Sequence, residues 1–579
     1  MSRQHHMSVD LPEDFSRCDV PLRPISQGAE QFPLPAMERF FQGSRCQHDT
    51  TLFGSFGWPL HPLESESPPP AQNRGKAENT KKAKSMREEI QESDNWDKLP
   101  FSFRTWKKWR ILCVVFLVQV SMNYNASAYA NAVDGISKEF DITHAKARLG
   151  QMIFLVAYGF GCEVWAPWSE ELGRRPVMQV SLFLVNAWQI LCGLATNFPS
   201  ILVGRALGGL SSAGGSVTLG MIADMWEPDE QQFAVAFIVL SSVAGSVVGP
   251  IAGGFIETRL HWRWNFWIQL YIGVAVQLAH FFLVPETRST TLLDRIAKKQ
   301  RKDGVADVYG PGEIRGSGFT FKELCVIWAR PFNMFFREPI VLFLSLLSGF
   351  SDALIFSFLE SFQPVFRQWG FGKIEIGLAF IPIMIGYFVG YFAFLPVIAK
   401  HRRILRTNPN GLVPEARLWL LLFTAPLETI GLAGFAATSL GPPEIHWIGP
   451  MFFATLIAIA NYAIYMATID YMVASYGPYS ASATGGNALA RDLLAGIAAL
   501  YSTPLYERFE GRLQLVIPSA LLGGIALLVT IPIYIFYWKG ETIRARSKFA
   551  QQLASDREIS KDRRIRRERE QKSKVGKEV

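Results

Sequence analysis

The sequence predicts an all-α integral membrane protein, with about twelve transmembrane helices arranged as two six-helix bundles. Only 19% of its 579 residues are charged and 49% are hydrophobic, whereas about a quarter of the residues of a soluble domain are charged. The charge is also segregated, because residues 1–100 and 540–579 are strongly polar and most of 110–538 is apolar. The apolar runs form two sets of six around a polar stretch, which indicates an internal duplication.

Each apolar run is long enough to cross a hydrocarbon core, which takes roughly 20 helical residues. The expected spans are 109–131, 147–168, 176–196, 199–225, 232–256 and 263–284 in the first half, and 339–365, 374–398, 416–438, 447–474, 483–505 and 513–538 in the second. The N-terminal tail is rich in Pro, Ser, Gln and charge, a composition typical of disorder. Five regions follow: a disordered cytoplasmic tail at 1–100, a bundle at 101–284, a cytoplasmic central loop at 285–335, a bundle at 336–538 and a basic cytoplasmic tail at 539–579.

Lys and Arg residues lie on alternate connections between the spans. They precede the first span, join the second to the third, fill the central loop and join the eighth to the ninth, whereas the connections at 196–199 and 439–446 contain none. Because cytoplasmic loops are enriched in these residues, we expect both termini and the central loop in the cytoplasm. We expect a monomer in the plasma membrane, with a vacuolar or vesicular membrane as the alternative.

Several function classes are disfavoured by what the sequence lacks. The six cysteines are scattered without metal-ligand spacing, and no phosphate-binding GxxxxGK[ST] loop is present, so ATP is not the expected energy source. No nucleophile elbow or HExxH helix indicates an enzyme, and we expect no catalytic residues, metal or cofactor. The net charge of +8 lies in tails and loops, so we expect the lipid bilayer, and not nucleic acid, as the macromolecular partner.

The turn between the second and third spans carries a charge cluster, with Glu170 followed by Gly173, Arg174 and Arg175. Glycine permits a tight turn, and arginines beside an acid can pair in one conformer and separate in another. Asp224, at the end of the fourth span, can reach these arginines. We therefore expect a cytoplasmic gate here; simple positive-inside anchoring of the loop is the alternative.

The fifth span contains a glycine-rich motif, formed by Gly245, Gly249, Pro250, Gly253 and Gly254. Glycines four residues apart give a flat helix face that lets another backbone approach. The proline removes one helical hydrogen bond. A pliable helix at the interface between the two bundles is therefore expected.

These two motifs resemble signatures of the major facilitator superfamily. The form Ala-Pro-Trp-Ser-Glu-Glu-Leu-Gly-Arg-Arg at 166–175 is typical of its fungal drug:proton antiporters, and 245–254 resembles the GxxxGPxxGG signature of its exporters. The resemblance covers nearly all of 105–548, and Gly161-Cys162-Glu163 is similar to a subgroup of secondary-metabolite exporters such as the cercosporin facilitator. The resemblance implies the two-bundle fold and proton-coupled export of small organic molecules. These molecules would be fungal secondary metabolites, toxins or drugs.

Ionisable residues inside the spans are the expected proton-coupling groups: Glu163, Arg205, Asp352 and Glu360. A charge at the bilayer centre costs ~2.5–3.5 kcal/mol on the insertion scale and usually marks function. The resemblance assigns Arg205 to proton-coupled transport. The alternatives are that Arg205 extends toward the membrane surface, and that the acids form structural ion pairs with Arg205 or Arg491.

The first span has polar residues every four positions, namely Gln119, Asn123, Ser127 and Asn131. This spacing places them along one helix face, and as a set they are expected to line a substrate cavity. Hydrogen-bonded packing against neighbouring helices is the alternative for each residue. Two further functions remain open for the whole chain: import of a polyamine or nutrient by the same fold, and a membrane sensor that does not transport.

Overall fold

The computed structural model describes residues 88–90, 92–212, 214–226, 230–304, 307–315, 321–408, 411–547 and 549–551. The expected N-terminal tail falls outside the described residues up to position 87, and the expected C-terminal tail falls outside them from position 552. The described residues all belong to one compact unit of the chain.

The first half of the described chain forms six membrane-crossing segments. They are α2 (Thr105–Ser127), which continues through η3 (Ala128–Ala132) and α3 (Val133–Glu139), α4 (His144–Glu171), α5 (Arg174–Gly193), α6 (Phe198–Ser211) with α7 (Gly214–Met225), α8 (Gln231–Arg259) and α9 (Trp264–Leu283). The span expected at 199–225 thus consists of two helices. Ser212 lies between them with extended backbone angles, and glycines and serines crowd this point of the sequence, which lowers helix propensity.

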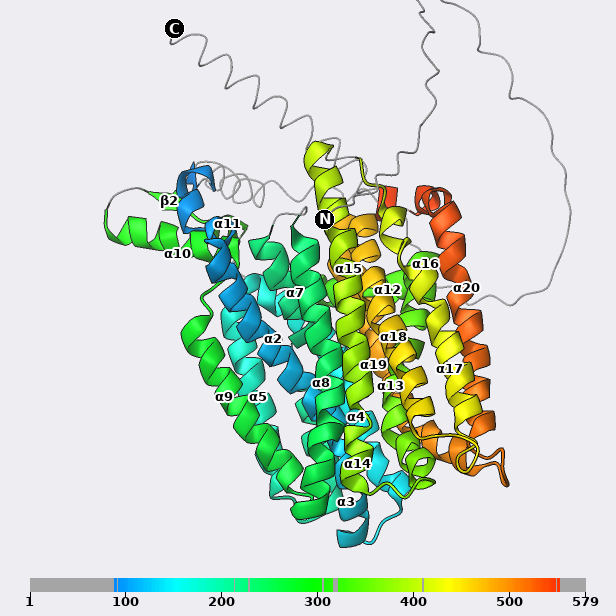
Figure 1. Cartoon of the computed structure of the whole chain (residues 1–579). Coiled ribbons are helices and arrows are strands. Elements are labelled where there is room, and N and C mark those ends of the chain that lie inside the picture. Colours follow the sequence, from blue (N-terminus) through cyan, green and yellow to red (C-terminus); the bar gives the residue numbers. More distant parts are fainter. Residues whose placement is uncertain are drawn as a thin grey trace, which may run out of the picture. The chain divides into compact units, whose positions relative to one another are not determined.

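The second half repeats this arrangement. Its segments are α13 (Pro339–Arg367), α14 (Lys373–Leu378) with α15 (Ile381–Thr407), η4 (Pro414–Leu418) with α16 (Leu421–Thr424) and α17 (Pro426–Thr438), α18 (Ile448–Tyr476), α19 (Ser480–Glu507) and α20 (Val516–Arg546). The 3-10 helix η5 (Gly477–Tyr479) joins α18 to α19. The all-α membrane fold with about twelve spans in two bundles is therefore confirmed (Figure 1).

Ten of the described helical segments are long and apolar enough to cross a membrane on their own. The interrupted segment α6 and α7 and the helix α19 complete the twelve. α19 is less apolar because it is rich in small residues and carries Arg491 and Asp492. Such a helix is expected to face other helices rather than lipid, and α19 packs against α13 and α4.

The stretch expected as a central loop contains regular structure. It comprises α10 (Ser289–Lys302), β2 (Val308–Tyr309), α11 (Pro311–Arg315) and α12 (Phe321–Arg337). The chain before α2 forms β1 (Glu88–Glu89), η1 (Ser93–Lys98) and η2 (Pro100–Ser102), and β1 pairs in parallel with β2. Ile90 and Leu99 bury apolar side chains against Leu293 and Ala297 of α10, so a small cluster joins the two segments.

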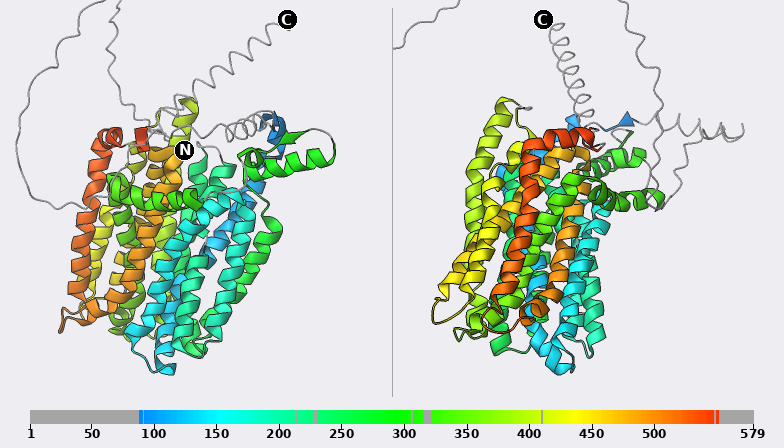
Figure 2. Two further views of the ribbon diagram at one scale, coloured as in Figure 1. Left: turned by 180° about the vertical axis from the view of Figure 1, so that it is seen from behind. Right: turned by 90° about the vertical axis from the view of Figure 1, so that its right-hand side faces the viewer.

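Contacts between the two bundles involve a few long helices. α4 of the first bundle packs along α19 of the second, and α8 packs against α14, α15 and α18. Figures 1 and 2 show the bundle helices running alongside one another in all three views. Below, the end of the bundle with the turn between α4 and α5 is called the Arg174 end, and the opposite end is called the Glu360 end.

Candidate functional site: a cavity between the two bundles

A cavity of about 280 Å³ with polar and apolar walls lies between the bundles. Its lining comes from α2, α4, α7, α8, the start of α5 and the segment after α9 on one side, and from α18 and α19 on the other. Polar or ionisable lining residues include Gln119, Glu163, Glu170, Arg174, Asp224, Arg288, Asn487, Arg491 and Asp492. The apolar and aromatic lining includes Tyr158, Leu219, Val235, Tyr465, Ile469 and Val473. A mainly apolar cavity with a few placed polar groups is the usual form of a small-molecule site.

Glu163 is a buried carboxyl group in the wall of this cavity. It lies on α4, its residue is only 8% exposed, and no hydrogen bond or ion pair joins it to another described residue. Its carboxylate packs against α19 at Gly485, where a Cβ atom would lie 2.2 Å from Oε1. A buried charge without a partner is unfavourable, so this group can gain stability from binding a proton or a ligand.

Arg205 is fully buried in the first bundle, on α6. Its Nη1 donates to the backbone and side-chain oxygens of Asn125 at 3.1 and 2.8 Å, and its Nε donates to the carbonyl of Gly150 at 3.2 Å. The guanidinium also lies over the rings of Tyr129 and Phe154, 4.7 and 3.9 Å from their centroids. Arg205 therefore neither extends to the membrane surface nor pairs with an acid; carbonyl oxygens and aromatic rings stabilise its charge.

Two acids of the second bundle, Asp352 and Glu360, lie close to arginines. Asp352 Oδ2 lies 3.7 Å from Nε of Arg491. This contact agrees with the alternative that an acid inside a span pairs with Arg491. Glu360 instead accepts a hydrogen bond of 2.7 Å from Nε of Arg148, on α4 of the first bundle, and a second from Thr503 at 3.1 Å. Arg148 is 212 positions from Glu360, and no pattern in the sequence linked the two residues.

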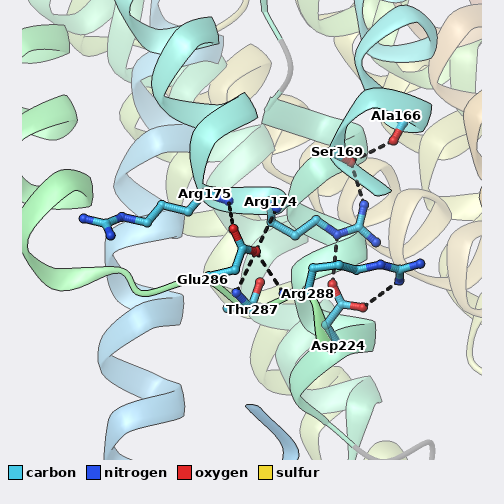
Figure 3. A network of polar contacts seen from close by, with 8 residues as sticks. All are labelled: Ala166, Ser169, Arg174, Arg175, Asp224, Glu286, Thr287 and Arg288. Atoms are coloured by element: carbon cyan, nitrogen blue, oxygen red, sulfur yellow. Dashed lines mark hydrogen bonds and ion pairs between the residues drawn. The ribbon is translucent and has the colours of Figure 1, made fainter. Parts of the chain in front are cut away.

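A charged network at the Arg174 end connects α4, α5, α7 and the segment after α9 (Figure 3). Arg174 Nε donates to Asp224 Oδ2 at 2.9 Å, and Arg288 Nη1 donates to Asp224 Oδ1 at 3.1 Å. The other end of the Arg174 guanidinium donates to Ser169 Oγ at 2.6 Å. Glu170 is exposed and makes no such contact, so Asp224 is the acid that binds Arg174.

Glu286 stabilises the turn between α4 and α5 from below (Figure 3). Its Oε1 accepts the backbone N–H groups of Arg174, Thr287 and Arg288, each at 2.9 Å. Gly173 has φ of 100°, and a Cβ there would lie 2.4 Å from Glu286 Oε2, so only glycine fits. Arg175 donates from its side chain to the Phe281 carbonyl at 2.7 Å. Neither Glu286 nor Arg288 was identified as part of the site from the sequence.

Different contacts join the two bundles at the Arg174 end. Glu230, before α8, accepts hydrogen bonds from Arg402 and Arg406 of α15. Gln232 donates to Asp470 at 2.5 Å, and Asp470 also pairs with Arg417. Arg174 and Arg417 each lie at the start of the third span of their bundle, and Asp224 and Asp470 each lie on the fourth. Each bundle therefore has its own arginine–aspartate pair.

The polar stripe of α2 faces the glycine motif of α8 for most of its length. A Cβ at Gly245 would lie 2.7 Å from Asn123 Cβ, one at Gly249 would lie 2.0 Å from Ser127 Oγ, and one at Gly253 would lie 1.9 Å from Asn131 Nδ2. The glycine row thus provides the space for these three side chains. Gln119 lines the cavity, whereas Asn123, Ser127 and Asn131 pack between helices.

The rest of the motif faces the second bundle. A Cβ at Gly254 would lie 2.6 Å from the Lys373 carbonyl, and one at Gly377 of α14 would lie 2.8 Å from the Pro250 carbonyl. Nearby, Lys373 Nζ donates to Glu257 Oε1 at 2.5 Å. Together with the Arg148–Glu360 pair, this contact joins the bundles at the Glu360 end. Among the described residues, no group of His, Cys, Asp or Glu is arranged to hold a metal ion.

Comparisons with known proteins agree with this architecture. The family model described as Major Facilitator Superfamily matches residues 115–499. The transporter paaT of Penicillium rubens is 28% identical over 543 residues, which cover 93% of this chain and 92% of that protein. Efflux pump FUB11 of Gibberella moniliformis is 28% identical over 454 residues, covering 78% and 75%. The solved structure of the proton:xylose symporter XylE is similar in fold, with a TM-score of 0.51, 15% identity, and coverage of 76% of this chain and 96% of that one.

Proposed function

Since the chain belongs to the Major Facilitator Superfamily, we propose that it exports small organic molecules across the membrane in exchange for protons. Transport of small molecules is the common activity of this family. Export is supported by relatives whose names describe efflux or drug resistance, such as efflux pump FUB11 and a cycloheximide resistance protein of Candida maltosa. The expected cargo is a fungal secondary metabolite, a toxin or a drug.

The observation that carries the proton coupling is Glu163, a buried carboxyl group without a partner in the wall of the cavity between the bundles. A carboxyl group in such surroundings can hold a proton when the cavity faces the side of higher proton concentration. It can release the proton when the cavity faces the other side. One charge that moves through the membrane field contributes about 2.3 kcal/mol per 100 mV, which is enough to concentrate a cargo substantially.

Alternating access would come from rocking of the two bundles around this cavity. At the Glu360 end, Arg148–Glu360 and Lys373–Glu257 join the bundles. At the Arg174 end, contacts of Glu230 and Gln232 also join the bundles. The network around Asp224 stays within the first bundle, however, and the cavity extends past it to the exposed Glu170. We propose that this conformer gives access to the cavity from the Arg174 end, and that the outward conformer forms when the pairs at the Glu360 end separate.

The same proposal includes the arrangement in the cell. The Arg174 end faces the cytoplasm, both termini lie there, and the protein works as a monomer in the plasma membrane. The cytoplasmic placement is supported by the Lys and Arg residues of α10 and by the two arginines at the start of α5, because such residues favour the cytoplasmic side. The five regions expected from the sequence then serve as two tails, two bundles and a cytoplasmic connection.

The test is substrate flux in sealed liposomes that contain the purified full chain. With an imposed proton gradient, cargo should move against its own gradient, and collapse of the proton gradient should stop this movement. Glu163→Gln should abolish proton-driven accumulation and leave exchange of cargo between the two sides. Glu444→Gln, at an exposed site in the second bundle, is the matched control. Undiminished accumulation by Glu163→Gln would exclude Glu163 as the coupling residue, and flux in symport would replace export by import.

A further inference from the structure

Two neighbouring charged residues of α19, Arg491 and Asp492, form part of the cavity wall. Both are more than nine-tenths buried, with exposed fractions of 6% and 4%. The Arg491 guanidinium lies over the ring of Tyr465 of α18, 3.9 Å from its centroid. This stacking fixes the position of the guanidinium plane in the cavity wall.

The hydrogen-bonding capacity of this pair is largely unused within the protein. Asp352 Oδ2 lies 3.7 Å from Arg491 Nε, and Asp492 Oδ1 lies 3.9 Å from Arg491 Nη2. These separations allow charge attraction but exceed hydrogen-bond length. Nε and Nη1 of Arg491 and Oδ2 of Asp492 have no hydrogen-bond partner among the described residues.

Buried polar atoms are nearly always hydrogen-bonded, and those that are not require an explanation. Arg205, which does not line the cavity, makes three hydrogen bonds to protein oxygens and leaves only Nη2 without a partner among the described residues. Arg491 lines the cavity, has Tyr465 as a side-chain hydrogen-bond partner, and leaves both Nε and Nη1 without one. The free N–H groups of Arg491 and the free carboxylate oxygen of Asp492 are therefore positioned to serve a ligand.

The charges around this pair restrict the chemistry of that ligand. Arg491 is already flanked by two carboxylates, those of Asp352 and Asp492, so an anionic group would meet acids on both sides of its arginine. An ammonium group could donate to Asp492 but could not accept from Arg491. A single uncharged group that accepts at one atom and donates from the next satisfies both residues.

We propose that Arg491 and Asp492 form a subsite for an uncharged donor–acceptor group of the cargo, such as a carboxamide or a hydroxy-ketone. Arg491 donates to the carbonyl oxygen, and Asp492 accepts from the adjacent N–H or O–H. The apolar lining, with Tyr158, Leu219 and Ile469, accommodates the ring or hydrocarbon body. This inference rests on the proposed transport function and specifies its cargo as compact, neutral organic molecules.

The test is equilibrium binding to the purified full chain in lipid nanodiscs, measured by calorimetry without a proton gradient. The four probes share one ring and differ in one group: benzamide both accepts and donates, methyl benzoate only accepts, benzoate is an anionic acceptor and benzylamine is a cationic donor. Benzamide should bind about tenfold or more tightly than each of the others, as expected for hydrogen bonds to charged groups. Equal affinities would mean that the subsite holds only water, and preference for benzoate or benzylamine would replace the neutral subsite by a charged one.

Variants locate the preference. Asp492→Leu, which keeps the side-chain size, should lower benzamide affinity about tenfold and leave methyl benzoate unchanged, whereas Asp303→Leu, at the exposed end of α10, should change neither. Arg491→Lys keeps the charge but removes the planar guanidinium group that donates to the carbonyl oxygen, so the affinities of benzamide and methyl benzoate should fall together. An unchanged ratio of the two affinities in Asp492→Leu, or unchanged affinities in Arg491→Lys, would overturn the proposal. The binding test uses no proton gradient, so it remains valid even if the liposome experiment shows no proton coupling. Conversely, loss of the expected order of probe affinities would not affect the evidence for proton coupling.

Discussion

The ion pair between Arg148 and Glu360 gives the sharpest prediction about how the two bundles separate. Arg148 lies on α4 and Glu360 on α13, so the pair joins the first bundle to the second. The two side chains are 12% and 8% exposed and approach to 2.7 Å. Glu360→Gln keeps the size of the side chain and the acceptor for Thr503, and it removes the negative charge that neutralises Arg148.

The magnitude follows from the burial of this pair. Removing one member of a buried ion pair costs about 3–5 kcal/mol, and the slight exposure of both side chains indicates the lower value. The loss falls on the conformer in which the Glu360 end is closed, because only there are the two residues in contact. At about 1.4 kcal/mol for each factor of ten, the ratio of open to closed conformers at this end should rise roughly a hundredfold.

The assay is the rate at which a maleimide labels Gln363→Cys, in purified protein without the native cysteines. Gln363 lines the two small cavities beside the ion pair, so its accessibility reports opening at this end. Glu360→Gln should raise the labelling rate tenfold or more, and the exchange Arg148→Glu with Glu360→Arg should restore slow labelling. The control is Glu444→Gln, which breaks an exposed pair with Arg512 inside the second bundle and should change nothing. Equal rates with and without Glu360→Gln would refute a role for this pair in closing the Glu360 end.

Two further predictions concern the interface of α2 with α8 and the segment around β2. Gly249→Ala places a Cβ atom 2.0 Å from Ser127 Oγ; such overpacking costs about 1–3 kcal/mol, so the thermal midpoint should fall, and Ser127→Gly in the same chain should recover part of the loss. Near β2, a hydrogen bond from Arg301 holds the pKa of Glu313 below its usual value. The contribution of Glu313 to the order of this segment is therefore present at neutral pH and lost as pH falls through that lowered pKa. The protection factors of the amide protons around β2, which correct for the intrinsic pH dependence of exchange, should fall on acidification in the wild type but not in Glu313→Gln.

Hydropathy predicts the spans well because a membrane helix must satisfy its backbone internally and bury an apolar surface. Both requirements act within about twenty residues, so they can be read from a short window of sequence. The interruption of the fourth span near Ser212 and the short helices before α17 escape such a window. They arise where small residues or prolines weaken the helix and neighbouring helices decide the local geometry.

The sequence predicts the residue types of the site and two of its contacts, Arg174 with Asp224 and Asp352 with Arg491. The cost of a carboxyl group or an arginine inside a span is the reason that Glu163, Arg205 and Glu360 are predicted as functional residues, but it says nothing about their partners. The sequence cannot indicate that Arg205 contacts the Asn125 and Gly150 oxygens, or that Glu360 reaches Arg148, because these contacts join helices far apart in the chain. The partner of a charge is determined by tertiary packing, and periodicity describes only one helix at a time.

The stripe on α2 shows the same limit and has a mechanical consequence. A period of four places Asn123, Ser127 and Asn131 on one face, and the structure places that face against the glycines of α8. The side chains fill the spaces that the glycines leave, so sliding of α8 along α2 would bring backbone against side chain. The neighbouring positions Pro250 and Gly254 face α14 of the second bundle. On one face, α8 therefore interdigitates with α2 of its own bundle. On the adjacent face, at Pro250 and Gly254, its backbone lies close to the backbone of α14 in the other bundle. Rocking of the bundles should then move α8 as one body with α2, and the sliding surface should lie between α8 and α14.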